Sequence, residues 1–446
     1  MATAPLDVGT LLDGGRSGRY QKLLIALVAV TIVFDGADIQ LLGLAIPAMM
    51  RDWGVPRSAF ASVLAAGMFG MMIGGAIAGL VGDLWGRKVA LLGSVATFGI
   101  LTVAAAAADS PTTMGVLRFL AGLGLGGAMP NAAALAAEFV PRRDRAIAVT
   151  VAIVCVPLGG MVAAAIAEGV LPAWGWRTLF VIGGVAPLVV AGVLALVIPE
   201  SPRFLARHPG RWPELAALLS RFGHPTPPDA AFVDASEHAV GRVSLGALFQ
   251  PAFRRDTLAL WAAFFFCLLG VYTAFNWVPS MLAGAGLAAH ATRGVLAFNL
   301  GGVFGAIAGA LVIARQGSKP TMLAMSAGAV ASALAMSAMP IVAGASPLPI
   351  IAMLALTGCL INAVQTTMYA LAAHVYPTSV RATGVGTAVA FGRTGGVLST
   401  YAGEWALASG GTAAFFGLIA AAMAVVFSAL AVIRGHIPRT PGKEKA

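Results

Sequence analysis

The chain has 446 residues, of which 59% are hydrophobic and 10% are charged, and its mean hydropathy is +0.88. This composition excludes a soluble globular enzyme or binding domain and is typical of a protein with many membrane-spanning helices. The net charge of +10 does not indicate binding to a nucleic acid, because most of the basic residues lie in the loops on one side of the predicted spans.

Twelve apolar stretches are long enough, at about 20 residues each, to cross a bilayer. Their approximate cores are 23–48, 58–80, 89–108, 112–138, 146–169, 177–198, 257–283, 293–314, 320–340, 347–372, 382–405 and 412–433. One long polar segment separates six spans from six, and PELAALLSRF within it predicts a short surface helix. We therefore expect an N-terminal arm at 1–22, a six-helix bundle at 23–198, a cytoplasmic linker at 199–256, a second six-helix bundle at 257–433 and a tail at 434–446.

The basic residues orient this topology. Of the 28 Lys and Arg residues, 22 fall on the side of the termini, four on the other side and two within spans. Since Lys and Arg concentrate in cytoplasmic loops, we expect a multi-pass protein of the inner membrane with both termini in the cytoplasm, acting as a monomer. Cys155, Cys267 and Cys359 are isolated within spans, so neither a disulfide framework, a metal site nor a cofactor is expected.

The two halves are related in sequence. LAAEFVPRRDRA at 135–146 matches LAAHVYPTSVRA at 371–382 at six of twelve positions. Such a parallel repeat predicts a pseudo-two-fold axis along the membrane normal, with substrate bound where the halves meet near mid-membrane. GLGLGG at 122–127 resembles a dinucleotide fingerprint, but no strand precedes it, so we interpret it as a close contact between helices.

Four charged residues lie well inside spans: Asp35, Asp38, Arg118 and Arg393. Each costs about 2.5–3.5 kcal/mol to insert, so such residues usually face a cavity or a partner. Asp35 and Asp38 share a helix face near mid-membrane, and two carboxylates in a poorly hydrated site cannot easily both ionise. We expect this pair to handle protons and favour Asp38 as the coupling site, with Arg118 as its counter-charge. The alternative is internal ion pairs that only tie helices together.

Arg393 is expected near the middle of span eleven. A guanidinium there is always charged and binds both oxygens of a carboxylate, so it suits an anionic substrate. The alternative is an ion pair with an Asp of span one that closes the empty cavity.

Several motifs identify a family. GLVGDLWGRK at 79–88, RFLAGLGLG at 118–126 and Glu138-x-x-Pro141-x-x-x-Arg145 together resemble the major facilitator superfamily. Asp35-Gly-x-Asp38, GGAMPNAAALAAEFVP, VYTAFNWVP and YPTSVRATGVGTAVAFGRTGG resemble its aromatic acid:proton symporters, which import benzoate-type acids. The resemblance implies an all-α fold of two six-helix bundles and a carrier for a small aromatic carboxylate and protons.

The resemblance also implies roles for further residues. Ring contacts and hydrogen bonds to an aromatic acid are expected from Asn131, Tyr272, Asn276, Trp277, Gln365 and Tyr369. Gating on the cytoplasmic face is expected from Gly79, Asp83, Arg87, Glu138, Arg145 and Arg381. Two alternatives of the same fold stay open: a sugar or non-aromatic organic-acid symporter, suggested by PESPR at 199–203, and a proton-driven drug exporter.

Overall fold

The structure is a computed structural model that describes residues 5–15, 17–227, 230–234, 245–377 and 380–439. Within these ranges, ten helices are long and apolar enough to cross a membrane. Two of them, α6 (Arg145–Val197) and α13 (Arg381–Val432), each hold two spans, because the backbone leaves helical geometry at Gly175 and at Gly410–Gly411. The twelve spans predicted from the sequence are therefore confirmed.

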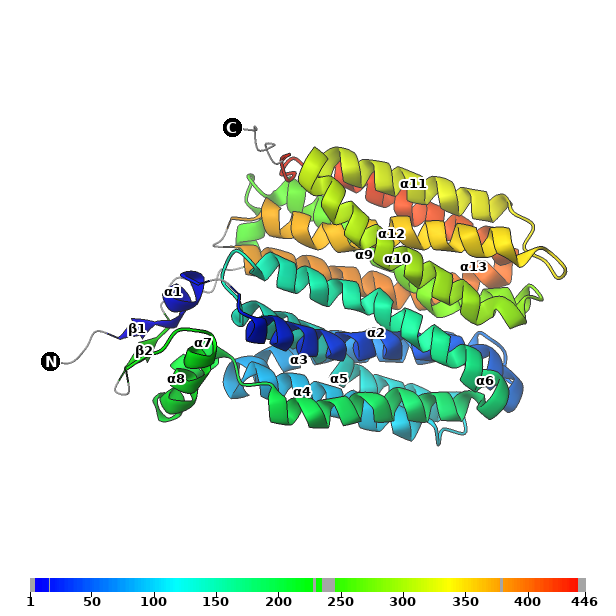
Figure 1. Cartoon of the computed structure of the whole chain (residues 1–446). Helices are drawn as coiled ribbons and strands as arrows, with labels where there is room; N and C mark the ends of the chain where they lie inside the picture. Colours follow the sequence, from blue (N-terminus) through cyan, green and yellow to red (C-terminus); the bar gives the residue numbers. More distant parts are fainter. Residues whose placement is uncertain (1–4, 16, 228–229, 235–244, 378–379, 440–446) are drawn as a thin grey trace.

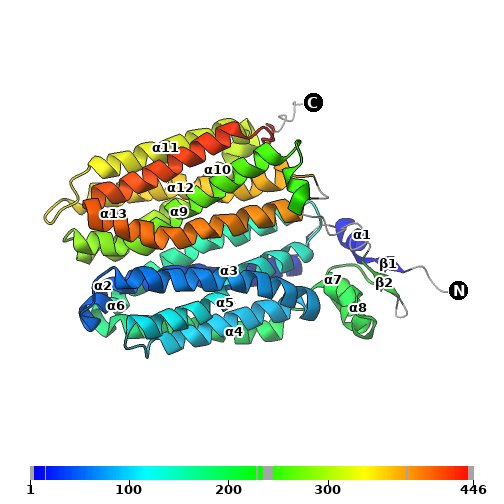
Figure 2. The same cartoon turned by 180° about the vertical axis from the view of Figure 1, so that it is seen from behind.

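The spans form two bundles that lie side by side (Figures 1 and 2). The first bundle combines α6 with α2 (Arg19–Trp53), α3 (Ala59–Trp85), α4 (Arg87–Ala105) and α5 (Pro111–Glu138). The second combines α13 with α9 (Arg254–Gly284), α10 (Ala291–Gln316), α11 (Ser318–Ala338) and α12 (Pro347–Val375). Both chain ends lie at one end of the bundles, here called the terminal end, and the other is called the opposite end (Figure 1).

Glycines allow helices of the first bundle to approach backbone to backbone. A Cβ atom at Gly126 of α5 would lie 2.1 Å from the carbonyl oxygen of Met71 on α3, and one at Gly122 would lie 2.3 Å from that of Gly67. Both separations are far below van der Waals contact, so only glycine fits there. The GLGLGG segment is thus a packing surface between helices, as expected.

The polar parts of the chain gather beyond the terminal end (Figure 1). The predicted linker helix is confirmed as α8 (Trp212–Arg221) and follows the short α7 (Pro202–Ala206). Within the described residues, short 3₁₀ helices lie at Pro209–Arg211, Leu245–Phe249 and Ala288–His290. Positions 228–229 and 235–244 of the predicted linker and 440–446 of the predicted tail lie outside the described residues.

The described part of the N-terminal arm contains a short strand and a short helix. β1 (Leu6–Asp7) pairs in parallel with β2 (Phe232–Val233) of the linker, and α1 (Val8–Asp13) follows with Asp7 as its N-cap. The linker itself is fastened to the first bundle by Glu200, which is 2% exposed and accepts a hydrogen bond from the backbone N–H of Lys88 at 3.0 Å. The arm and linker therefore form one small cap on the terminal end of the first bundle.

Candidate functional site

A cavity of about 300 Å³ lies between the two bundles. Its walls come from the first bundle (Asp35, Ile39, Met71, Leu125, Met129, Pro130, Ala133, Ile153, Val156 and Pro157) and from the second (Leu268, Tyr272, Gln365, Thr366, Tyr369, Val385, Val389 and Arg393). Along α13 the lining runs from Val385, near the terminal end, to Arg393, about 18 Å from the start of the helix. This central cavity therefore occupies the middle of the bundles and the half nearer the terminal end.

Arg393 reaches from the second bundle to the first. Its Nη1 donates a hydrogen bond to the carbonyl oxygen of Met71 on α3 at 2.8 Å. The path is open because Gly75 has no side chain: a Cβ atom there would lie 2.6 Å from Nη1. No carboxylate of the described residues lies within 4.0 Å of the guanidinium. A guanidinium carries five N–H donors, so most of them remain available to a ligand in the cavity.

Asp35 lines the same cavity from the first bundle. Its side chain is 2% exposed, and Oδ1 has no hydrogen-bond partner among the described residues. A buried carboxylate without a compensating donor or counter-charge is costly when ionised. Asp35 is therefore a group whose charge depends on what else the cavity contains.

Asp38 has a different environment, although it lies on the same helix. Its Oδ2 accepts a hydrogen bond from Nη2 of Arg118 at 2.7 Å, and its Oδ1 accepts from Nη1 at 3.3 Å and from the hydroxyl of Thr102 at 2.6 Å. Asp38 and Arg118 are 1% and 4% exposed, and neither lines the central cavity. The predicted pairing of Asp38 with Arg118 is present and joins α2 to α5. The hydrogen bond from Thr102 joins Asp38 to α4 as well.

Three of the predicted ring contacts line the cavity: Tyr272 on α9, and Gln365 and Tyr369 on α12. The Tyr369 ring packs edge-on against Phe264, with the ring centroids 5.3 Å apart. No hydrogen bond of the described residues uses the hydroxyl or amide groups of the three lining side chains. They can therefore serve ring hydroxyls of a bound ligand.

The other three predicted contacts do not line the cavity. The amide of Asn131 donates to the carbonyl oxygen of Ala78 at 3.1 Å and ties α5 to α3. Trp277 is fully buried in the second bundle, where its indole N–H donates to the carbonyl oxygen of Thr400 at 3.1 Å. Asn276 is fully buried beside Arg118 in a separate small pocket. The rotation of their helices thus turns these three side chains away from the central cavity, and their expected contacts with substrate stay a prediction.

The predicted gating residues all lie at the terminal end: Gly79, Asp83, Arg87, Glu138, Arg145 and Arg381. Arg87 forms an ion pair with Asp83 and lies 3.8 Å from Glu138, while Arg145 pairs with Asp13 of α1 at 3.1 Å. These pairs connect α4 to α3 and α5, and α6 to the arm. They therefore brace the first bundle and its cap.

Arg381 donates to the carbonyl oxygen of Tyr376 within the second bundle at 3.3 Å, and Gly79 faces open space. Between described residues, none of the hydrogen bonds or ion pairs at the terminal end joins the two bundles. The bundles are thus not latched to each other at this end.

The opposite end is held closed by contacts that the sequence reading did not single out. Gln40 on α2 and Asn299 on α10 exchange two hydrogen bonds, at 2.9 and 2.7 Å, and both side chains are fully buried. Glu168 on α6 pairs with Arg293 on α10 at 2.7 Å. The Gln40–Asn299 pair could have been suspected from the sequence, since amide side chains buried within membrane spans need hydrogen-bond partners, as buried charges do.

Comparisons with known proteins agree with this architecture. The sequence model described as Major Facilitator Superfamily matches residues 28–400. The chain is 32% identical over 443 residues to the gallate transporter of Pseudomonas putida, covering 97% of each chain. It is 32% identical over 411 residues to the 4-hydroxybenzoate transporter PcaK of the same organism, covering 91% of this chain and 90% of that one. Among solved structures, the partially occluded inward open xylose transporter XylE of E. coli is similar at a TM-score of 0.74 and 15% identity, covering 92% of this chain and 97% of that chain.

Proposed function

This chain belongs to the major facilitator superfamily, and we propose that it imports a small aromatic carboxylate together with protons by alternating access of its two bundles. It is a multi-pass membrane protein, and the relatives named above are transporters rather than enzymes. The substrate class rests on those relatives, which are named for gallate and 4-hydroxybenzoate, and on the chemistry of the central cavity.

The observation that carries the substrate assignment is the free guanidinium of Arg393. It stands in an enclosed, largely apolar cavity and has no carboxylate partner among the described residues. A substrate carboxylate can accept two parallel hydrogen bonds from it. The ring then lies among Tyr272, Tyr369 and apolar side chains, while Gln365 is in reach of ring hydroxyls. A neutral sugar would leave the charge of Arg393 uncompensated, which disfavours the sugar-symporter alternative.

We assign proton uptake to Asp35 rather than to Asp38, which the sequence favoured. Asp35 faces the central cavity with an unpartnered Oδ1, whereas Asp38 is held by Arg118 and Thr102. When a substrate anion occupies Arg393, a proton on Asp35 removes an uncompensated charge, but a proton on Asp38 would leave Arg118 buried without its counter-charge. Asp35 is therefore better suited than Asp38 to take up and release a proton during transport.

The basic loops orient the two ends of the bundles in the membrane. We place the terminal end in the cytoplasm, because 22 of the 28 Lys and Arg residues fall on that side. The contacts at the opposite end then close the central cavity toward the outside, and substrate leaves toward the cytoplasm. In the other half of the cycle the gating pairs around Arg87 and Glu138 would meet the second bundle.

Uptake into proteoliposomes tests the proposal. With an imposed inward proton gradient, radiolabelled benzoate, 4-hydroxybenzoate or gallate should accumulate, and the gradient should increase the rate. Arg393→Ala should weaken binding of the acid by about ten- to hundredfold, as expected for loss of roughly 1.5–3 kcal/mol of charged hydrogen bonding. Binding of the corresponding neutral amide should change much less.

Arg393→Lys is the matched control, since it keeps the charge but loses the planar fork, and its affinity should be intermediate. Absence of gradient-stimulated uptake for every aromatic acid would rule out the function. Equal losses for acid and amide would rule out the carboxylate contact.

A further inference from the structure

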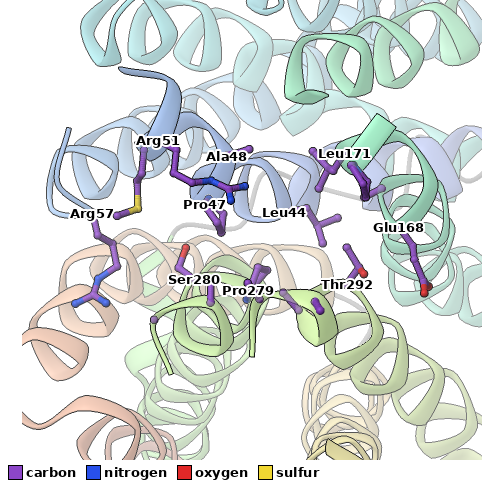
Figure 3. Close-up of a pocket in the computed structure, with 18 residues that line it drawn as sticks. Leu44, Pro47, Ala48, Arg51, Arg57, Glu168, Leu171, Pro279, Ser280 and Thr292 are labelled. Atoms are coloured by element: carbon purple, nitrogen blue, oxygen red, sulfur yellow. The ribbon is translucent and has the colours of Figure 1, made fainter. Parts of the chain in front are cut away.

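A second and larger cavity of about 720 Å³ opens at the opposite end of the bundles. Figure 3 shows it between α2 and α6 of the first bundle and α9 and α10 of the second. No residue lines both this cavity and the central one, and the paired amides of Gln40 and Asn299 lie on the α2 and α10 helices that separate them. Its volume is within the range of about 300–1,000 Å³ usual for ligand pockets. We call it the outer vestibule.

Two arginines bring positive charge to the outer vestibule. Arg51 makes no hydrogen bond or ion pair with any described residue, and it extends over Pro47 into the cavity (Figure 3). Arg57 stands at the rim, where its Nε is buried without a hydrogen bond and the nearest carboxylate, that of Glu404, is 3.9 Å away. Both guanidiniums therefore have donors to spare.

Two carboxylates near Arg51 are engaged by other groups. Asp52 is engaged by Arg177 at 2.6 Å and by the indole N–H of Trp176 at 3.0 Å. Glu168, the one acidic residue of the lining, pairs with Arg293 at 2.7 Å. An anion that enters the vestibule thus meets Arg51, whose charge is not neutralised by a described carboxylate, and Arg57, whose one ion pair, with Glu404, is long at 3.9 Å.

Ser280 supplies an independent sign of a ligand. Its side chain is 4% exposed and its Oγ has no hydrogen-bond partner among the described residues. In Figure 3 the hydroxyl is directed into the vestibule, across from Pro47. A buried hydroxyl without a partner is destabilising, and a polar group of a ligand in the cavity would supply the missing hydrogen bond. Leu44, Pro47 and Pro279 offer an apolar surface beside it.

We propose that the outer vestibule is a second binding site for the aromatic carboxylate, occupied before the central cavity opens to it. Arg51 binds the carboxylate, Ser280 bonds a carboxylate or ring oxygen, and the ring lies on Leu44, Pro47 and Pro279. Arg57 adds attraction at the entrance. The inference rests on the proposed function and extends it, because capture in the vestibule raises the local concentration of an anion next to the outer gate.

Equilibrium binding separates the two sites. Radiolabelled 4-hydroxybenzoate is titrated against the full-length protein in lipid nanodiscs, as wild type, as Arg393→Ala and as Arg393→Ala/Arg51→Gln. Arg393→Ala should retain a weaker class of sites, and the added Arg51→Gln should weaken that class by about tenfold. Arg51→Lys should preserve most of it. The double variant Asp52→Asn/Arg177→Gln removes an ion pair from the same face outside the vestibule lining and serves as the control.

A chemical measurement does not depend on the stability of the arginine variants. The thiol introduced by Ser280→Cys should react with a water-soluble methanethiosulfonate added from outside, and 4-hydroxybenzoate should slow the reaction in the Arg393→Ala background. If Arg393→Ala abolishes all binding and the acid gives no protection, the vestibule site is refuted while the transport proposal stands. If wild-type protein neither binds nor takes up any aromatic acid, the transport proposal itself fails.

Discussion

Asp35→Asn is the substitution that most directly tests how protons are coupled to the substrate. Asparagine has nearly the same size as aspartate but cannot take up or release a proton. The carboxylate is 2% exposed and its Oδ1 has no partner, so the neutral amide removes a buried charge without breaking any ion pair. We expect the variant's free energy of unfolding to stay within about 1–3 kcal/mol of wild type, because the substitution breaks no hydrogen bond or ion pair of a described residue.

Asp38→Asn should behave in the opposite way. It removes the partner of Arg118, whose Nη2 lies 2.7 Å from Asp38 and whose side chain is 5% exposed. Breaking a buried pair by removing one partner costs about 3–5 kcal/mol, because the other charge stays buried. The two aspartates, one turn apart on α2, should therefore differ in thermal unfolding by several kcal/mol.

Transport distinguishes their roles further. An inward gradient of one pH unit supplies about 1.4 kcal/mol per coupled proton, which raises the accumulation limit about tenfold. Asp35→Asn should lose this gradient-driven accumulation of 4-hydroxybenzoate but keep exchange of labelled for unlabelled acid in proteoliposomes. Full accumulation by Asp35→Asn would refute the assignment. Loss of accumulation by a stably folded Asp38→Asn would support the sequence-based preference instead.

Two further substitutions test the packing and the outer closure. Gln40→Ala leaves Oδ1 of Asn299 without its hydrogen-bond donor, at a cost of about 1–3 kcal/mol. This should favour the outward-open state and increase thiol labelling of Ser280→Cys from outside. Unchanged labelling would argue against a latch. Gly126→Ala places a Cβ atom 2.1 Å from a backbone carbonyl oxygen of α3 and should lower the free energy of unfolding by at least about 1–3 kcal/mol. Gly93→Ala is the control, because a Cβ atom there would have no other atom within 4 Å and should not destabilise the protein. Equal stability of the two variants would refute the close contact.

Most of the fold could be predicted from the sequence because each span is long and continuously apolar. The linker helix α8 was predictable for a related reason, since its apolar residues recur at helical spacing. The pairing of β1 with β2 was not, because each strand has two residues and its partner is more than 200 positions away. Strands of two residues are too short to show the alternation of apolar and polar residues that predicts a strand.

The sequence identified the charged residues of the site but not the neighbours that each of them contacts. The high cost of charge in a membrane singled out Asp35, Asp38, Arg118 and Arg393, and all four meet a cavity or a partner. Spacing along one helix could not say which neighbour each faces, since that depends on how the helix is rotated in the bundle. For this reason Asp35 and Asp38 share a helix yet have different surroundings, and Trp277 points into the second bundle.

The placement of Asp35 and Arg393 on different bundles suggests why substrate and proton would move together. With the carboxylate bound and Asp35 protonated, the cavity carries no net charge, and the same holds when it is empty with Asp35 ionised beside Arg393. Either ligand alone leaves one uncompensated charge, which costs several kcal/mol to enclose between apolar walls. The bundles can therefore close readily around both ligands or neither, which is the condition for symport. This rule needs only one titrating group, so in the proposed cycle Asp35 would take the proton, and the Asp38–Arg118 pair would hold the first bundle together while it moves.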